Sequence, residues 1–380
     1  MATRHWGLLA AELERLAVAV DESAALGLTR VALPDVERVA ALFEDELRRP
    51  VVLPGQNAVL LPETALDQVL AGLRVRFASR HSGWFPTFGK NREVVGGVGN
   101  PIYIARFAQE PRPEKLPAVS SVEGRNDGSG IRIGVLDTPD PGPVPVSTGE
   151  TAAGTGTGTE AGTGTGTGTG TDQATPFWKG HGTFVQGLIR QQAPAAQILL
   201  NGVLSGDRAT ASSWDVAKAL VAMDDVELIN LSLACLTADN QPPLVLQAAI
   251  DALPPETLVV AAAGNYEFTD GPRRYTPPAW PAAMDRVLAV GSSGEDGTRS
   301  RFSPDEPWVA RTERGEDLVS AYLTGKVVGA QGQVLGPFSG GAVWSGTSFA
   351  AAVFSGRLAA LAGRRGCSVR EALTSLPGTP

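Results

Sequence analysis

The sequence of 380 residues is poor in cysteine and has no long apolar run. Cys235 and Cys367 are its only cysteines, too few for a disulfide framework, so a reducing, cytoplasmic setting is expected. No stretch reaches the roughly 18 uncharged apolar residues that a membrane helix needs. The N-terminus begins like a weak signal peptide, but Glu12, Glu14 and Arg15 interrupt it and no clear cleavage site follows. We therefore expect no membrane partner.

Positive charge is also scarce. The chain has 32 Lys and Arg against 40 Asp and Glu, which gives a formal net charge of −8, and no basic run stands out. This charge is not typical of a nucleic-acid-binding protein, so no nucleic-acid partner is expected. The sequence also lacks a compact Asp-rich loop with the spacing of calcium ligands. We assign no metal and no cofactor, and the oligomeric state stays open.

Residues 1–110 have the apolar spacing of helices. Three stretches repeat apolar side chains every three or four positions: residues 5–20, 33–47 and 62–73. Pro34 and Pro62 stand where helices commonly begin. A polar connector follows over residues 111–130, and one short extended piece is expected over residues 100–107. The mainly helical N-terminal region could be a prodomain, a partner-binding domain or a structural extension.

The pattern changes from residue 131 onward. Short β-branched runs alternate with helical patterns, which indicates strands over residues 131–137, 196–203, 226–234, 257–264 and 286–292 and helices over 181–191, 214–223, 244–253 and 348–363. This predicts an α/β fold, with a mostly parallel sheet covered by helices on both faces. Such sheets bind ligands at the carboxyl ends of their strands.

The expected α/β domain covers residues 131–365. A Gly/Thr low-complexity loop, residues 151–171, interrupts it and has almost nothing to bury, so we expect it to be disordered. A C-terminal tail is expected over residues 366–380. Residues 327–341 have the pattern of an extra hairpin near the functional edge of the sheet.

Ser348 stands between small and apolar residues in "WSGTSFAAA", residues 344–352. A serine nucleophile needs a base, which is usually an imidazole because it titrates near neutrality. The chain has three histidines, His5, His81 and His181, and the last opens a helical pattern between two glycines. Taken alone, the serine could be a helix cap, and the histidine at position 181 a satisfied buried polar group.

Two further polar residues follow expected strands. Asp137 ends the strand over residues 131–137, where it could orient an imidazole or serve as a turn residue. Asn265 follows Gly264 at the end of another strand, where it could donate an amide to an oxyanion or form an ordinary turn. The order Asp, His, Asn, Ser at strand ends and helix starts is far more specific than any one of the four residues.

The stretches "VLDT", "GHGT", "INLSLA", "AAAGN" and "SGTSFAAA" occur in this order and resemble the subtilisin-like serine proteases, the subtilase family. The resemblance covers residues 131–365 and implies a serine endopeptidase. It makes Ser348 the nucleophile, His181 the general base and Asp137 the residue that orients and stabilises the imidazole. It makes Asn265 a donor to the oxyanion, together with the backbone N–H of Ser348.

The resemblance also implies a binding surface for a peptide or protein substrate. One group of residues resembles a strand that pairs with extended substrate backbone: Leu231, Ser232 and Leu233. A second group would line the pocket for the side chain before the scissile bond: Ala262, Ala263 and Gly264. Their small side chains indicate a broad, apolar preference.

Two positions depart from the family pattern. Pro139 stands where the aspartate motif usually has glycine, and it lacks an N–H that could support Asp137. This leaves open a catalytically impaired, peptide-binding protein of the same fold. Ala352 replaces a usual proline and suits a helix better. An esterase of the α/β-hydrolase type is disfavoured, because its catalytic residues run in the order Ser, acid, His.

If the N-terminal region is a prodomain, we expect a cut in the proline-punctuated connector between residues 109 and 130. This stretch is polar, and exposed mobile chain is where proteolysis concentrates. The cut would depend on the protein's own catalytic residues.

Overall fold

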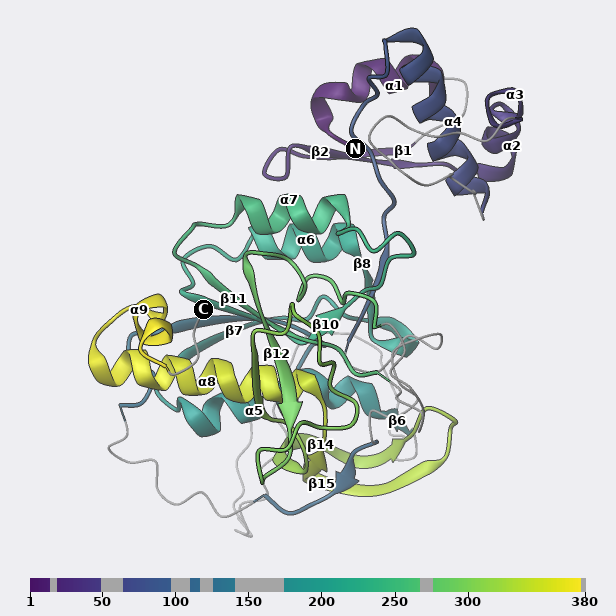
Figure 1. Ribbon diagram of the computed structural model, residues 1–380. Helices are drawn as coiled ribbons and strands as arrows, with labels where there is room; N and C mark the ends of the chain where they lie inside the picture. Colours follow the sequence, from purple (N-terminus) through teal and green to yellow (C-terminus); the bar gives the residue numbers. More distant parts are fainter. Residues whose placement is uncertain are drawn as a thin grey trace, which may run out of the picture.

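A computed structural model describes residues 1–13, 19–48, 64–96, 110–116, 126–140, 174–266 and 276–376. The extended piece expected over residues 100–107 and the Gly/Thr loop over residues 151–171 lie outside these ranges. A small N-terminal unit precedes a larger α/β body (Figure 1).

The N-terminal unit combines helices with one β-hairpin. Its elements are η1 (Thr3–His5), α1 (Trp6–Leu13), β1 (Ala19–Ser23), β2 (Leu28–Ala32), α2 (Val36–Ala41), α3 (Glu44–Leu47) and α4 (Ala65–Arg80). The helical character is confirmed, but the helix expected over residues 5–20 is wrong at its end, because Ala19 and Val20 belong to β1. Val20 is β-branched and pairs with Val31 of β2, and this pairing outweighs the helical spacing of apolar residues.

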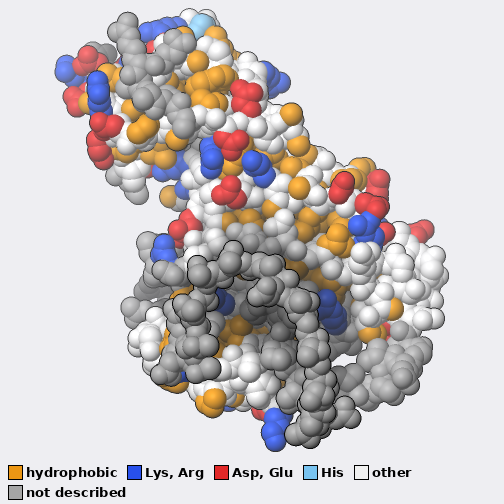
Figure 2. Space-filling model, turned by 180° about the vertical axis from the view of Figure 1, so that it is seen from behind, with side chains coloured by type: hydrophobic (Ala, Val, Ile, Leu, Met, Phe, Trp, Pro, Cys, Tyr) orange, Lys and Arg blue, Asp and Glu red, His pale blue; other side chains and the backbone are white. Residues whose placement is uncertain are grey.

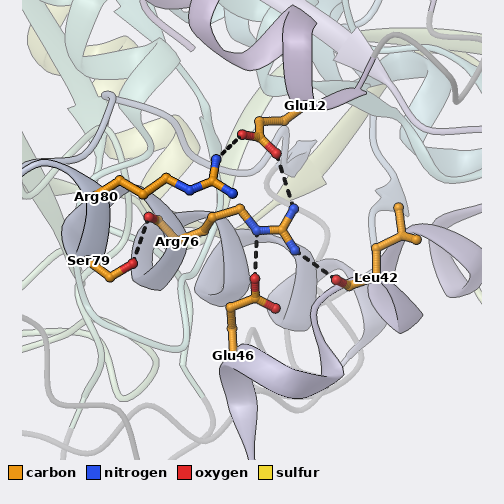
Figure 3. Close-up of polar contacts among 6 residues, drawn as sticks. All are labelled: Glu12, Leu42, Glu46, Arg76, Ser79 and Arg80. Atoms are coloured by element: carbon orange, nitrogen blue, oxygen red, sulfur yellow. Dashed lines mark hydrogen bonds and ion pairs between the residues drawn. The ribbon is translucent and has the colours of Figure 1, made fainter.

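Arg76 on α4 joins the helices of the N-terminal unit (Figure 3). Its guanidinium donates to the carboxylates of Glu12 on α1 and Glu46 on α3, at 3.2 and 2.6 Å. It also donates to the carbonyl oxygen of Leu42 at 2.8 Å, and it lies 4.3 Å from the centre of the Phe43 ring. One forked guanidinium therefore fixes three helices relative to one another.

The body is built on a sheet with the strand order β13-β12-β11-β9-β5-β7. These strands are β5 (Arg132–Leu136), β7 (Gln197–Asn201), β9 (Leu228–Leu231), β11 (Leu258–Ala262), β12 (Val287–Ser293) and β13 (Arg311–Arg314). Every neighbouring pair runs parallel. The central strands β9 and β11 are buried along their whole length, because both faces of the sheet are covered.

Helices cover the two faces of this sheet (Figure 1). The helices of the body are α5 (His181–Gln192), α6 (Ser213–Val221), α7 (Leu244–Ala252), α8 (Thr347–Arg365) and α9 (Val369–Thr374). Phe184 of α5 and Leu358 of α8 belong to one buried cluster, and Leu220 of α6 and Leu246 of α7 belong to another. The predicted α/β fold with a covered parallel sheet is confirmed.

Part of the C-terminal tail expected over residues 366–380 forms the helix α9. Ser368 and Glu371 form a reciprocal capping box that starts α9, and Val369 and Ala372 of this helix are buried. Two side-chain acceptors for backbone N–H groups are enough to begin a helix that packing then stabilises.

Two smaller sheets flank the parallel one. The first has the order β4-β15-β14-β6, from β4 (Arg112–Pro113), β6 (Thr175–Pro176), β14 (Leu318–Val328) and β15 (Val334–Trp344). The hairpin predicted over residues 327–341 is therefore present and longer than expected. The second has the order β10-β3-β8, from β3 (Glu93–Gly96), β8 (Thr210–Ser212) and β10 (Leu233–Ala234). Its central strand comes from the N-terminal part of the chain.

The N-terminal unit packs against the start of α6. Trp214 donates its indole N–H to the Asp21 carboxylate of β1 at 2.8 Å, and the Arg30 guanidinium lies 5.9 Å from the centre of its ring. Leu26 and Leu28 belong to the same buried cluster as Trp214. Figure 2 shows the unit projecting from the body, with acidic and basic side chains interspersed on the face in view.

In the part of the chain that the structure describes, no helix is long and apolar enough to cross a membrane. The described residues also bring no three His, Cys, Asp or Glu side chains together as a possible metal site.

Candidate active site

Asp137 and His181 meet at the carboxyl edge of the parallel sheet. Asp137 directly follows β5, and His181 is the first residue of α5. The Nδ1 atom of the imidazole lies 2.7 Å from Oδ1 of the carboxylate. The His181 side chain is 2% exposed and that of Asp137 is 0% exposed. A buried carboxylate in this position favours the tautomer that leaves Nε2 able to accept a proton.

The glycines on either side of His181 allow α5 to approach its neighbours closely. A Cβ on Gly182 would lie 2.3 Å from the carbonyl oxygen of Thr138, and a Cβ on Gly180 would lie 2.3 Å from the ring of Tyr322. The backbone N–H of Gly182 donates to Thr138 Oγ1 at 2.8 Å. The "GHG" pattern therefore brings the start of α5 against the Asp137 turn.

Ser348 lies in the first turn of α8. This helix begins at Thr347 with Gly346 as its N-cap residue, so the expectation that Ser348 itself caps the helix is wrong. The cap lies two residues earlier because the Gly346 carbonyl accepts the first hydrogen bonds of the helix, from Phe349 and Ala350. The backbone N–H of Ser348 still belongs to the first turn, where the helix dipole favours negative charge.

Buried polar side chains fix the backbone at Ser348. Ser232 donates its hydroxyl to the Ser348 carbonyl oxygen at 2.9 Å. Asn230 donates its Nδ2 to Ser232 at 3.0 Å and accepts from Ser355 of α8 at 3.1 Å. A chain of satisfied buried hydrogen bonds thus joins the end of β9 to α8 and determines where the serine stands.

Asn265 is attached to the residue before the serine. Its Oδ1 accepts from both the backbone N–H and the hydroxyl of Thr347, each at 2.9 Å. The Gly264 N–H in turn donates to Thr347 Oγ1 at 3.1 Å. Since Oδ1 points at Thr347, the amide Nδ2 lies on the side of Gly346, 3.5 Å from where a Cβ on that glycine would be.

Two buried atoms have the properties of a base and a nucleophile. His181 Nε2 and Ser348 Oγ are both buried and without a hydrogen-bond partner among the described residues. The His181 ring lies 5.4 Å from the ring of Phe349, the residue after the serine, and meets the Trp344 ring edge-on at 5.6 Å. Aromatic packing therefore holds the imidazole against the serine helix.

The turn after Asp137 accommodates the unusual proline. Thr138 donates its backbone N–H to Asp137 Oδ1 at 2.7 Å, and Oδ2 has no partner in the described part of the chain. A Cβ on Gly202 would lie 2.6 Å from the Pro139 Cβ, so glycine makes room for the proline ring. The carboxylate keeps its histidine partner and one backbone donor.

A small cavity of about 10 Å³ lies beside Ser348. Of the residues predicted to bind substrate, Leu233, Ala262 and Gly264 line it, together with Asn265. The other three are elsewhere in the site region. Ser232 supports the serine backbone, Leu231 packs in the core on the α6 side, and the Ala263 N–H donates to the carbonyl oxygen of Val290.

Strand β3 belongs to this region, although sequence reasoning did not place it there. Its residues Val95 and Gly96 line the same cavity. Gly96 pairs with Leu233, and Val95 pairs with Ala234 on one side and Thr210 on the other. In the sequence, only the short β-branched run "EVVGG" indicates a strand here. Such a run does not indicate which strands it pairs with.

The comparisons with known proteins agree with this geometry. The model of the "Subtilase family" matches residues 128–367, more than half of the chain. An "Intracellular serine protease" of Paenibacillus polymyxa is 28% identical over 207 residues, which are 52% of this chain and 58% of that protein. The "Major intracellular serine protease" of Bacillus subtilis (strain 168) is 30% identical over 199 residues, which are 50% and 56%. The chain thus spans little more than half the length of these relatives.

Among solved structures, the protease domain of PatA is 26% identical, with a TM-score of 0.47 over 67% of this chain and 90% of that chain. The MycP3 protease from the type VII (ESX-3) secretion system is 24% identical, with a TM-score of 0.44 over 65% and 76%. The match over residues 128–367 contains the buried Asp-His pair, Asn265 and the serine at the start of α8. On this match, the chain belongs to the subtilase family.

Proposed function

We propose that this protein is a serine endopeptidase. The observation that carries the proposal is the buried Asp137–His181 pair, with Nδ1 and Oδ1 2.7 Å apart, next to the helix that has Ser348 in its first turn. The unpaired Nε2 and Oγ atoms and the fixed orientation of Asn265 support it further. The substrate class that fits is a peptide or protein chain bound in extended form.

The roles follow from the chemistry of each group. Ser348 Oγ attacks the scissile carbonyl carbon while His181 Nε2 takes the hydroxyl proton, and Asp137 stabilises the resulting imidazolium. The oxyanion accepts hydrogen bonds from Asn265 Nδ2 and the Ser348 backbone N–H. The imidazolium then protonates the leaving amine, and water hydrolyses the acyl-enzyme by the same steps in reverse.

Labelling with a fluorophosphonate probe tests the proposal directly. Wild-type protein should react at one residue, and Ser348→Ala should not react while keeping its fold. Ser375→Ala is the matched control, because it removes a serine hydroxyl at the end of α9, outside the hydrogen-bond chain that positions Ser348, and should leave labelling intact. Labelling that survives Ser348→Ala would refute the assignment. A wild type that binds peptide without being labelled would favour the catalytically impaired alternative that Pro139 suggests.

We further propose that the N-terminal region inhibits the site within the same chain. β3 is the middle strand of a three-stranded antiparallel arrangement, between β10 and β8, and its Gly96 lines the cavity beside Ser348. Ser348 is 1% exposed. A substrate strand would need the position that β3 fills. Of the three roles open for this region, these observations favour a prodomain.

A proline in β3 tests this inhibition. Val95→Pro removes a backbone N–H from a central strand, which a sheet does not tolerate, and should raise the rate of fluorophosphonate labelling. Val95→Thr keeps a β-branched strand former and is the control. An unchanged rate in the proline variant would count against inhibition by β3.

The same arrangement changes the expected cut. Because Gly96 lines the cavity beside Ser348, we propose that cleavage occurs shortly after Gly96 and not between residues 109 and 130. Intact mass measured by mass spectrometry after incubation of the wild type and of Ser348→Ala tests this cleavage, because only the wild-type chain should become shorter. The cytoplasmic location and the absence of nucleic-acid and membrane partners stay predictions.

A further inference from the structure

A large cavity lies where the N-terminal unit meets the body. Its volume is about 370 Å³, and its lining includes none of the catalytic residues. Helices α1 and α4 and strand β2 of the N-terminal unit form one part of its wall, and α6 and α7 of the body form another (Figure 1). Small-molecule ligands commonly bind in cavities of this size at the junction of two units. The proposed peptidase reaction makes no use of this one.

The wall of the cavity is mostly aliphatic. Leucine and valine side chains of α1 and α4 line it from the N-terminal unit, among them Leu13, Leu70 and Leu73. Trp214 and Leu244 line it from the body. An apolar cavity of about 150 Å³ holds one benzene molecule, so the present cavity has room for roughly a dozen carbon atoms. An aliphatic chain of that size could bury its methylene groups here.

The charged side chains among the described residues that line the cavity are both cationic, Arg30 and Lys90. The Arg30 guanidinium lies 3.3 Å from the carboxylate of Asp21, and the Lys90 ammonium lies 2.5 Å from that of Asp67. A guanidinium has five N–H donors and an ammonium has three, so one ion pair leaves donors on each. These two side chains can therefore donate to the carboxylate of a ligand.

A third cation lies behind the wall of the cavity. The Arg74 guanidinium lies 5.2 Å from the centre of the Phe88 ring, and Phe88 lines the cavity. Arg74 forms no ion pair in the described part of the chain. Burial lowers the pKa of the Arg74 guanidinium, because a cation is less stable away from water. An anion nearby would offset this cost, so the charge around the cavity favours an anionic head group.

Only a short segment separates the cavity from β3. Residues 89–91 line the cavity, and β3 begins at Glu93. Asn91 Oδ1 accepts from the Ser213 hydroxyl at 2.9 Å and from the Trp214 backbone N–H at 3.0 Å. An occupant of the cavity would contact this segment and both units. It would therefore bind the docked arrangement more tightly than a separated one, and so favour the docked arrangement.

We propose that this cavity binds an aliphatic carboxylate of about ten carbon atoms, with its carboxylate at Arg30 and Lys90, and that the ligand holds the N-terminal unit on the body. Binding does not depend on the peptidase reaction, and only its effect on the active site rests on the proposed function. The bound ligand would keep β3 beside Ser348. At one hundred times its Kd, it would favour the docked arrangement by about 100-fold.

Isothermal titration calorimetry of the full chain with sodium decanoate, below its micelle concentration, tests the binding. Affinity should rise about fourfold with each methylene from hexanoate to decanoate and then level off once the cavity is full. Decanol and decyltrimethylammonium have the same chain without the anion and should bind about tenfold more weakly or worse. Absent decanoate binding, equal binding of the three compounds, or an affinity that keeps rising to tetradecanoate would overturn the inference.

Variants test the position of the ligand. Leu70→Trp fills part of the cavity and should weaken decanoate binding, whereas Leu42→Trp adds the same ring at a residue that is 51% exposed and should not. Lys90→Met keeps an apolar stem and should weaken binding of decanoate about tenfold but not of decanol. Lys326→Met, at an exposed lysine of β14, is its control. Unchanged decanoate affinity in both cavity variants would overturn the site, and Lys90→Met decides if Leu70→Trp does not fold.

The effect on the active site is a separate measurement. Saturating decanoate should slow fluorophosphonate labelling of the wild type, and the same concentration should slow that of Lys90→Met less. Unchanged or faster labelling of the decanoate-bound wild type would overturn the coupling. If the wild type is not labelled at all, the proposed function fails, and amide hydrogen exchange over β3 decides instead. Decanoate should slow this exchange, and an unchanged exchange rate would overturn the coupling.

Discussion

Asn265 has two separable contributions, because its oxygen and its nitrogen face different partners. The oxygen accepts two hydrogen bonds from Thr347, and the nitrogen is the proposed donor to the oxyanion. Asn265→Ala removes both contributions. Asn265→Asp keeps an acceptor oxygen for Thr347, removes the donor and adds a negative charge beside the oxyanion, which lowers kcat further.

The magnitudes follow from this geometry. Loss of one oxyanion donor lowers kcat by about 10²–10³ with little change in KM, because it acts mainly in the transition state. In Asn265→Ala, the buried N–H and hydroxyl of Thr347 also lose their acceptor, at about 1–3 kcal/mol per group. A loss of about 3 kcal/mol lowers the Tm by roughly 6–12 °C for a domain of this size.

The two variants should therefore share a low kcat but differ in stability. Steady-state kinetics on an alanine-containing peptide and thermal denaturation measure both quantities. Thr347→Ser is the control, because it keeps both donors to the Asn265 oxygen and should retain activity. A loss confined to KM in Asn265→Asp would refute the oxyanion role, and an unchanged Tm in Asn265→Ala would refute the structural one.

Three further changes test other parts of the structure. Gly182→Ala places a Cβ 2.3 Å from the Thr138 carbonyl oxygen, so the overpacking should destabilise the protein by about 1–3 kcal/mol and lower kcat; wild-type denaturation and kinetics would contradict it. Burial raises the pKa of the Cys235 thiol to about 12, so a thiol reagent at pH 8 should modify Cys367 and spare Cys235, as peptide mapping can check. Deletion of residues 151–171 should leave folding and activity within a few-fold, and an unfolded product would show a structural role for the loop.

The parallel sheet and the four polar residues could be predicted from the sequence because their signals are local. Asp137 directly follows a buried strand, and His181 and Ser348 lie in the first turns of helices, so each is marked by an element boundary. In a parallel sheet these boundaries converge on one edge. Short motifs at such boundaries therefore predict a shared site without any knowledge of packing.

The parts that could not be predicted depend on contacts between distant segments. The run at β3 does not reveal that it pairs with Leu233 and Thr210, because strand propensity carries no information about partners. Tyr266 reads as an ordinary residue after a turn, and its position under Gly264 depends on Pro277 and Ala279. Likewise, residues 19 and 20 have a helical apolar pattern but form a strand, because they pair with β2 across the hairpin.

The attachment of β3 to the rest of the chain has a consequence for competition. A strand tethered next to its groove is present at an effective concentration on the order of millimolar. Even a weakly binding strand then occupies the groove. Its effective concentration exceeds that of a free peptide at micromolar concentration by about a thousandfold. Cleavage after Gly96 would turn β3 into a separate ligand held through the contacts of the N-terminal unit, such as Trp214 with Asp21. Inhibition of the cleaved protein would then weaken on dilution. Inhibition within the uncut chain would not depend on protein concentration.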